Sequence, residues 1–333
     1  MSTLPIAGST YDKQLSAAKT FITERDHFLV VAHLHPDGDA AGSTVAVGLL
    51  LEQLGKTYVM VNEGSIPRKL AFLPNADDVV NYEEVGLQRK YNSVICIDCA
   101  DDSRIGDVRD AFTEDAQILN IDHHPTNDGF GSVSLIRTDA AATVEILYDL
   151  FQAFELTWNQ PLATAIYTGL LTDTGGFRYS NTTPHVMAIA AEMLRLGVDG
   201  HELANNLLEK SSFAHILLLK KALSTLTFSD NNRLAWVMVT AADMAETGAT
   251  NEDFEGIVNY PRNIDGVEVG LLFKETAADT YKVGFRSAGK VDVAQLAKSF
   301  GGGGHVRAAG CTLNGTLDDV VTQVTERVRS ALQ

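Results

Sequence analysis

The chain has 333 residues, of which 45% are hydrophobic, so it is long enough for two globular domains and does not have the composition of a disordered protein. Its 43 acidic residues outweigh its 26 basic ones and give a formal net charge of -17, which argues against a protein that coats long nucleic acid through a basic surface. Any nucleic acid that it binds is therefore expected to be short.

The beginning of the chain, MSTLPIAGSTYDKQ, has neither the basic region nor the apolar region of a signal peptide. The uncharged run at residues 40–51 is too short to span a bilayer. The three cysteines are an odd number and fit reduced thiols. We therefore expect a cytoplasmic protein without membrane contact. The oligomeric state stays open, a homodimer included.

From residue 13 to about 190, short apolar runs alternate with longer stretches of helical period, which favours an α/β domain with a parallel sheet and helices on both faces. The strands are predicted at 28–32, 57–61, 94–97 and 117–121. Three of these strands end directly before His33, Asp98 or Asp122. Ligands of open parallel sheets bind beyond the carboxyl ends of the strands, so we expect these side chains to meet at one edge.

The segment HLHPDGDA follows the first predicted strand and contains His33, Asp37 and Asp39. Pro36 and Gly38 shape a turn before an apolar helix, and the two alternating aspartates could face two neighbouring ions. The alternative is structural, because Asp39 could be the N-cap of that helix and Asp37 a turn residue.

The segment NSVICIDCADDSR ends an apolar run at Asp98, where a buried carboxylate costs several kcal/mol unless it is paired or bound to a metal. Its position makes it a natural bridging ligand, although a solvated loop acid is the alternative. The segment ILNIDHHPTND places Asp122, His123 and His124 at another strand end. Consecutive side chains there point in different directions, so one histidine could bind metal while the other faces substrate. Asp122 could orient His123.

The segment GLLTDTGGFRYSNT repeats this arrangement with an apolar run, then Asp173, then paired glycines that let the backbone approach a ligand closely. Carboxylates and imidazoles without a thiolate suit two divalent cations, manganese as the first choice and magnesium as the second. Two ions about 3.5–4 Å apart can activate water and clamp the oxygens of an in-line displacement at phosphorus. The predicted chemistry is phosphoester hydrolysis, with the ligands His33, Asp37, Asp39, Asp98, His123 and Asp173.

Residues 186–226 have a nearly continuous helical pattern broken at Gly197 and Gly200, and we interpret them as a linker. A hairpin with its turn at 229–232 and strands at 267–273 and 281–286 follow, which predicts a second, smaller α/β domain with a mixed sheet. The expected organisation is a catalytic domain at 1–190, a helical linker at 191–216 and a substrate-binding domain at 217–333.

The segments HLHPDGDA, ICIDCAD, IDHHPTN and TDTGGF resemble, in this order, the motifs of the DHH phosphoesterase superfamily. The later segment VGFRSAGKVDVAQLAKSFGGGGHVRAAG resembles the DHH-associated domain of its nano-RNase, pAp phosphatase and cyclic-dinucleotide phosphodiesterase branches. The resemblance covers most of the chain and implies that the ligand is enclosed by both domains.

The resemblance also implies roles for single residues. His33 and Asp37 would hold one ion, the set Asp39, His123 and Asp173 would hold the other, and Asp98 would bridge the two. His124 would face the scissile phosphate, with Asp98 and Asp122 completing the catalytic group.

Substrate contacts are expected from the C-terminal segment. Arg286 could make a bidentate contact to a terminal phosphate and Ser287 could add a hydroxyl, although a solvated arginine at a strand end is the alternative. His305 could hydrogen-bond to a base or stack on it. Glycine N–H groups could cradle a phosphate, although flexible turns have the same pattern. These glycines are Gly301, Gly302, Gly303 and Gly304.

The expected activity is manganese-dependent hydrolysis of short oligoribonucleotides to 5′-mononucleotides, to which the resemblance adds the conversion of 3′-phosphoadenosine 5′-phosphate (pAp) to AMP. A linear or cyclic dinucleotide phosphodiesterase remains an alternative. An inactive nucleotide-binding regulator is the alternative from a different class. A pyrophosphatase is disfavoured, because the superfamily's pyrophosphatases have a different C-terminal domain from the one that the GGGGH segment indicates.

Overall fold

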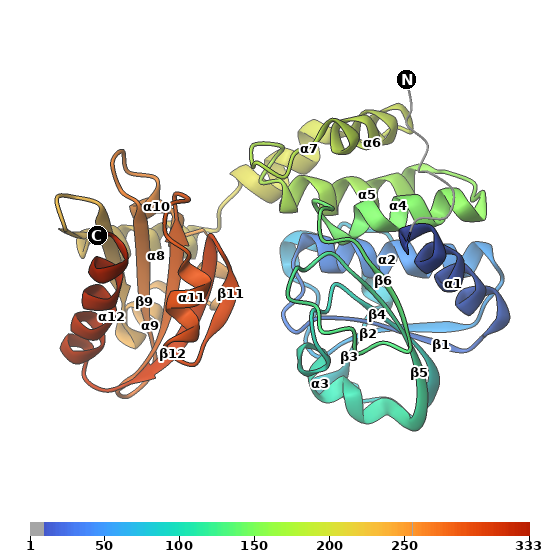
Figure 1. Cartoon of the computed structure of the whole chain (residues 1–333), viewed down its shortest axis with the longest axis horizontal. Coiled ribbons are helices and arrows are strands. Elements are labelled where there is room, and N and C mark those ends of the chain that lie inside the picture. The colour runs from blue at the N-terminus through green and yellow to red at the C-terminus, as the bar shows by residue number, and fades with distance from the viewer. Residues whose placement is uncertain (1–9, 255) are drawn as a thin grey trace. The chain divides into compact units, whose positions relative to one another are not determined.

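The computed structural model describes residues 10–254 and 256–333. Residues 1–9 are outside the described residues. They make up most of the initial segment MSTLPIAGSTYDKQ, in which the sequence shows no signal-peptide pattern. The chain divides into two compact units, residues 1–210 and residues 211–333 (Figure 1). Each unit has its own hydrophobic core around its own sheet.

The first unit is built on a sheet of parallel strands in the order β3-β2-β1-β4-β5-β6. The four predicted strands are present. The two others, β3 and β6, have only two and four residues, so their apolar stretches are too short to indicate a strand. The strands are β1 (Phe28–Ala32), β2 (Tyr58–Asn62), β3 (Val80–Asn81), β4 (Tyr91–Ile97), β5 (Phe112–Asp122) and β6 (Val133–Ile136).

Long helices cover one face of this sheet, where Val30, Ile95 and Leu119 join their core. On the opposite face, Leu29 and Cys96 belong to a smaller core with the 3₁₀ segment η3 (Asp102–Ala111). Helices therefore lie on both faces, as predicted, but only one face carries long ones. The helices are α1 (Thr10–Glu24), α2 (Gly38–Gln53), α3 (Tyr82–Val85), α4 (Thr143–Phe154), α5 (Gln160–Asp173), α6 (Pro184–Arg195) and α7 (Gly200–Ala204).

Helices α2 and α5 pack at short range because glycines remove side chains from their contact. A Cβ atom on Gly42 would lie 2.6 Å from the carbonyl oxygen of Ala165, and one on Gly169 would lie 2.6 Å from Oδ1 of Asp39. This packing brings the end of α5, where Asp173 lies, to the start of α2. The apolar run before Asp173 is thus a helix and does not repeat the strand-end arrangement of the other segments.

The second unit contains a mixed sheet in the order β11-β12-β10-β9-β8-β7, in which only β8 and β9 run parallel among the paired strands described. The α/β fold, the mixed sheet and the hairpin turn near residues 229–232 are confirmed. The strands are β7 (Thr227–Ser229), β8 (Leu234–Val239), β9 (Val269–Ala277), β10 (Thr280–Ser287), β11 (Gly303–His305) and β12 (Ala308–Asn314).

Helices α11 and α12 cover one face of the second sheet, packing on Val283 and Phe285, and α8 packs against the other face at β8. Strands β11 and β12 were not predicted, since their small residues lack the β-branched composition that indicates a strand. The helices are α8 (Phe213–Ser224), α9 (Ala241–Thr247), α10 (Asn259–Arg262), α11 (Val293–Lys298) and α12 (Leu317–Ala331).

The region expected to be one linker divides between the two units. Helix α6 and helix α7 bury Ile189 and Leu203 in the first core, whereas α8 buries Leu218 in the second unit. The helical pattern ends at a π-helical turn, η4 (Asn205–Glu209), and Lys210 has extended backbone angles. Because the break falls there, the boundary lies at Lys210 and not within a separate linker of residues 191–216.

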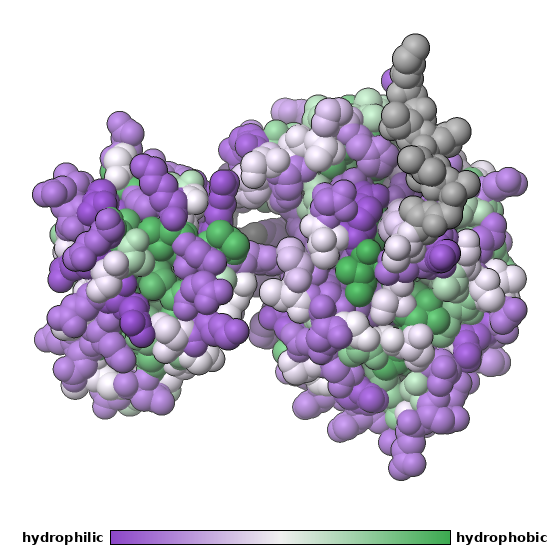
Figure 2. All heavy atoms as spheres, viewed as in Figure 1, coloured by the Kyte–Doolittle hydropathy of each residue, from purple (hydrophilic) through white to green (hydrophobic). Residues whose placement is uncertain are grey.

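In the part of the chain that the structure describes, no helix combines the length and the apolar character needed to cross a membrane. On the face shown in Figure 2, hydrophilic residues predominate on both units and hydrophobic groups form small patches. The three cysteines are buried free thiols.

Candidate metal centre

The strand order of the first unit places its ligand site beside β1 and β4. These two strands are neighbours, and the chain leaves them towards opposite edges of the sheet, which defines the point where open α/β sheets bind ligands. His33 follows β1 directly and Asp98 follows β4, so both lie at the carboxyl ends of the strands. Asp122 ends the adjacent strand β5.

The first cluster consists of His33, Asp37 and Asp98. The Nε2 atom of His33 lies 3.5 Å from Oδ2 of Asp98 and 4.0 Å from Oδ1 of Asp37. Nδ1 of His33 donates to the carbonyl oxygen of Leu34 at 2.7 Å, which leaves Nε2 as the atom that can bind a cation. Within the described residues, these three side chains are near enough together to hold a metal ion.

The second cluster consists of Asp39, His123 and Asp173. The Nε2 atom of His123 lies 3.5 Å from Oδ2 of Asp173 and 4.0 Å from Oδ2 of Asp39. Nδ1 of His123 donates to the carbonyl oxygen of Ala140 at 3.3 Å, so this ring is oriented in the same way as His33. These three side chains could also hold one ion.

Asp98 lies between the two clusters. Its Oδ2 atom faces His33, whereas its Oδ1 atom lies 3.6 Å from Nε2 of His123. The backbone of Asp98 is left-handed, with φ of 57°, a conformation that aspartate tolerates better than most residues. Thr143 donates its hydroxyl to Oδ1 at 2.8 Å. The two carboxylate oxygens therefore point to different clusters, which is the geometry of a bridging ligand.

The electrostatics of this centre call for positive charge. Burial, and then the nearby carboxylates, Asp98 among them, hold the pKa values of Asp39 and Asp173 well above their ordinary range. Burial would lower the pKa of His33, but its hydrogen bond and attraction to Asp98 raise it to about 9. Burial would raise the pKa of Asp98, and the neighbouring histidines lower it instead.

Divalent cations fit this donor set. Oxygen and nitrogen ligands suit hard and borderline ions, and the buried thiols of Cys96 and Cys99 are not among the clustered ligands. Two cations would balance the charge of the four carboxylates and remove the repulsion that contributes to the raised pKa values of Asp39 and Asp173.

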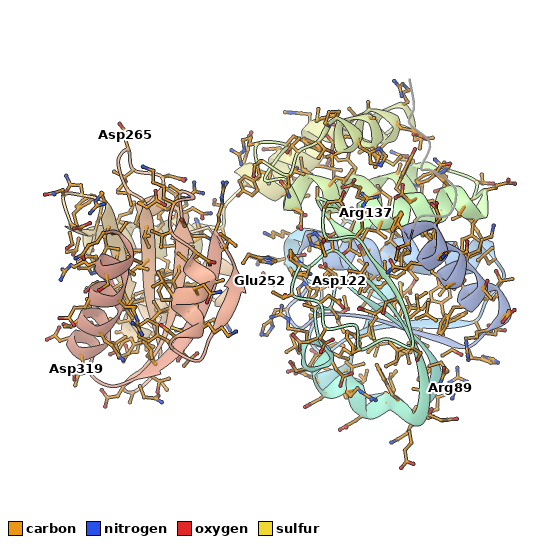
Figure 3. All side chains as sticks on the ribbon, viewed as in Figure 1. Arg89, Asp122, Arg137, Glu252, Asp265 and Asp319 are labelled. Carbon is orange, nitrogen blue, oxygen red and sulfur yellow. The ribbon has the colours of Figure 1, made fainter. Side chains whose placement is uncertain are left out.

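Asp122 orients His124 and not His123, which corrects the expectation from sequence. Nδ1 of His124 donates to Oδ1 of Asp122 at 2.7 Å, and the amide of Asn127 donates to Oδ2 at 2.6 Å. Burial would lower the pKa of His124, but the hydrogen bond to Asp122 and the charge of Asp98 raise it. Asp122 is itself fully buried at the end of β5 (Figure 3).

The N-cap of α2 is Asp37, whereas the structural alternative from the sequence assigns that role to Asp39. The Oδ1 atom of Asp37 accepts from the backbone N–H groups of Asp39 and Ala40. Asp39 instead accepts from the N–H groups of Thr143 and Val144, at the start of α4. Capping and cluster membership therefore occur together, because a helix N-terminus holds an anion in place.

The glycine pair after Asp173 has a structural role. Gly175 and Gly176 have positive φ angles, and the N–H of Gly176 donates to the carbonyl oxygen of Leu171, which ends α5 as a C-terminal cap. The pair therefore closes the helix that carries Asp173, where a close approach to a ligand was expected.

Sequence reasoning missed three residues around the centre. Thr143 hydrogen-bonds to Asp98, Asn127 holds Asp122, and Asn181 donates to the backbone oxygen of Asp173 at 3.1 Å. Asn127 follows the DHH run closely and could have been suspected. Asn181 lies in the segment that carries Asp173 and could have been suspected for the same reason, whereas Thr143 carries no local signal because Asp98 is distant in sequence.

In the second unit, strand register places Arg286 and His305 on one face of the sheet. Both pair with Ala308, which lies on β12 between them, and paired residues of antiparallel strands point to the same side. Two residues away, a row of three glycines crosses the same strands, formed by Gly284, Gly310 and Gly303. The result is a strip without side chains beside an arginine and a histidine.

Other expected substrate contacts are already engaged inside this unit. The hydroxyl of Ser287 donates to Oε1 of Glu268 at 3.1 Å and accepts from the N–H of Gly289. The N–H groups of Gly301 and Gly302 donate to carbonyl oxygens of α11, so they cap that helix. Gly303 and Gly304 belong instead to the edge strand β11 and are exposed.

A parallel sheet with carboxylates and histidines in two clusters at its switch point, followed by a second α/β unit, defines a two-domain metal-dependent phosphoesterase. Two family models match the chain: the N-terminal domain of the DHH family over residues 27–170 and the DHHA1 domain over residues 234–333. The chain therefore belongs to the DHH family, and the enzyme class predicted from its sequence is confirmed.

Relatives match the chain over most of its length. The bifunctional oligoribonuclease and PAP phosphatase NrnA of Thermus thermophilus is 34% identical, covering 97% of this chain and 95% of the relative. The protein of the same name from Bacillus subtilis is 31% identical, covering 86% and 90%. A crystal structure of an exopolyphosphatase-related protein from Bacteroides fragilis has a TM-score of 0.87 at 24% identity, covering 96% of each chain, and shows the same fold.

Proposed function

We propose that this protein is a manganese-dependent phosphodiesterase that hydrolyses short oligoribonucleotides, from dinucleotides to a few nucleotides, to 5′-mononucleotides. The proposal includes a second activity that dephosphorylates pAp to AMP. The names of the Thermus and Bacillus relatives support both substrates. The observation that carries the proposal is the pair of clusters and the position of Asp98, whose two carboxylate oxygens face one histidine of each cluster.

The reaction adds water across a P–O bond. Bound cations would supply an activated water and neutralise charge on the phosphate oxygens. His33 and His123 present Nε2 to the centre because their Nδ1 atoms are held by backbone carbonyl groups. In His124, Nδ1 is held by Asp122, so a contact with the phosphate or a proton for the departing oxygen would come from Nε2.

The second unit would bind the nucleotide. The glycine row provides a surface on which a base can lie flat, and Arg286 beside it can pair with a phosphate. Strand spacing places the backbones of Arg286 and His305 about 10 Å apart. Replacing Arg286 with Ala is expected to raise KM about tenfold while kcat changes little, because a phosphate that does not react is bound equally in the ground state and the transition state.

Asp98→Asn tests the catalytic part of the proposal. With manganese and a dinucleotide, turnover is expected to fall at least about 10³-fold, because one side chain serves both clusters. The measurement is chromatography of the mononucleotide product, with circular dichroism to show that the fold persists. Asp110→Asn, an exposed change of the same chemistry, is the matched control. Retained turnover in Asp98→Asn would contradict the assignment.

A panel of substrates and metals tests the finer claims. Metal-stripped protein would be supplied in turn with manganese, magnesium and zinc, and manganese is expected to restore the highest turnover. The substrates would be pAp, linear and cyclic dinucleotides, and oligonucleotides up to 24-mers. A preference for the 24-mer or for the cyclic dinucleotide would overturn the proposed substrate class.

A further inference from the structure

The segment between β6 and α4, residues 137–142, reaches the second cluster through its backbone. The carbonyl oxygen of Ala140 accepts from Nδ1 of His123 at 3.3 Å. The carbonyl oxygen of Ala141 accepts from the amide of Asn181 at 3.3 Å, and the same amide donates to the backbone oxygen of Asp173 at 3.1 Å. The position of this connector therefore affects two of the three residues of the second cluster.

The first turn of α4, directly after the connector, holds the third residue. The N–H groups of Thr143 and Val144 donate to the two oxygens of Asp39 at 2.6 and 3.0 Å. Asp39 is fully buried, so these bonds determine where its carboxylate lies. Among the interactions that the structure describes, this first turn of α4 contacts the first cluster only through the hydrogen bond from the hydroxyl of Thr143 to Asp98.

One buried carboxylate holds both ends of the connector. Glu145, which is 3% exposed, accepts from the N–H of Ala141 at 2.7 Å through Oε2 and pairs with the guanidinium of Arg137 through Oε1. Arg137, labelled in Figure 3, also pairs with Asp149 at 2.5 Å through its guanidinium, and its backbone N–H donates to the carbonyl oxygen of Asp122. Glu145 and Asp149 thus hold the side chain of Arg137, and Asp122 holds its backbone.

We propose that the Glu145–Arg137 ion pair is a positioning device for the second ion, the one that Asp39, His123 and Asp173 would hold. The pair touches none of these ligands itself. It fixes the connector and the start of α4, whose backbone groups orient Asp39 and His123 and, through Asn181, the end of α5. Loss of the pair would loosen the second cluster, while the first cluster keeps His33 and Asp37 on other elements.

Manganese binding to the full-length protein tests this inference, which rests on the proposed two-ion site. Isothermal titration calorimetry and electron paramagnetic resonance would count the ions and measure each Kd. Glu145→Gln keeps an oxygen acceptor for Ala141 but loses the charge that pairs with Arg137. We expect the second ion to bind about 10- to 100-fold more weakly and the first within about twofold of the parent protein.

Tyr148→Phe is the matched control, because Tyr148 lies on the same helix and its hydroxyl bonds to Glu192 on α6, away from the connector. It should leave both ions unchanged. Arg137→Lys is the milder variant if Glu145→Gln does not fold, and it should weaken the second ion in the same direction.

Three results would overturn the inference: unchanged binding in both the Glu145 and Arg137 variants, equal weakening of both ions, or the same loss in Tyr148→Phe. A parent protein that binds fewer than two ions would instead refute the proposed two-ion function.

Discussion

Each unit buries carboxylates, but the two units stabilise them differently. In the second unit, Oε1 of the buried Glu268 accepts four hydrogen bonds, from the hydroxyl of Ser287 and from the backbone N–H groups of residues 289–291. These donors satisfy the negative charge and shape the loop after β10. This carboxylate therefore needs no cation to remain buried.

In the first unit, several carboxylates converge on the same small volume. Asp39 receives backbone donors from α4, yet its pKa and that of Asp173 are raised by burial and by the carboxylates around them. The comparison shows that burial of an acidic residue does not by itself indicate a metal site. The metal site is indicated instead by several acids that converge with histidines within a few ångströms of one another, where burial and charge repulsion raise the pKa values of Asp39 and Asp173.

The largest expected difference between the two settings is their response to metal. Manganese at 1,000 times its Kd should stabilise the first unit by about 4 kcal/mol for each ion, because the ions bind only the folded centre. The second unit should be unaffected. Hydrogen exchange measured on each unit, with manganese and with a chelator, checks this. Equal protection of both units on adding manganese would break the comparison.

Glu268→Ala should have the next largest effect, and in the other unit. The substitution leaves a hydroxyl and several backbone N–H groups without their acceptor, which should lower the free energy of unfolding by about 3 kcal/mol. Urea unfolding of the full-length protein measures it, and manganese affinity should stay unchanged. Glu326→Ala, which removes an exposed glutamate on α12, is the control variant.

Asp173→Asn should have a smaller effect of opposite sign when metal is absent. Removing one of the converging carboxylates relieves repulsion, so the metal-free protein should become more stable by about 1 kcal/mol. The same variant should lose affinity for the second ion, since a ligand charge is gone. Chemical unfolding with a chelator and manganese titration measure the two effects. A less stable metal-free variant would count against the repulsion argument.

The pH dependence should be the mildest test. Because the pKa of His33 is raised to about 9 in the fold, its stabilising contribution is complete below its unfolded pKa of about 6.5 and is lost as pH rises through 9. The raised pKa values of Asp39 and Asp173 act in the same direction. The melting temperature of the metal-free protein should thus decrease as the pH is raised from 6.5 to 9. Saturating manganese should flatten the profile, because the ions replace the protons.

Much of the centre could be predicted because its signals are local. His33 and Asp98 follow apolar strands, and a strand end can be read from a few neighbouring residues. The parallel arrangement then brings strand ends to one edge whatever their distance in sequence. For the same reason the α/β class, the mixed second sheet and the family were accessible from the sequence alone.

The remainder depends on contacts between distant segments, which no local pattern encodes. Asp173 reaches the centre from a helix because Gly42 and Gly169 let α5 approach α2. The choice of His124 as the partner of Asp122 follows from side-chain directions at the end of β5. The glycine row exists only through strand register. The sequence by itself determined which residue types stand at the strand ends, whereas the tertiary structure decided which of them hold, orient and balance one another, because those relations arise only once distant elements pack.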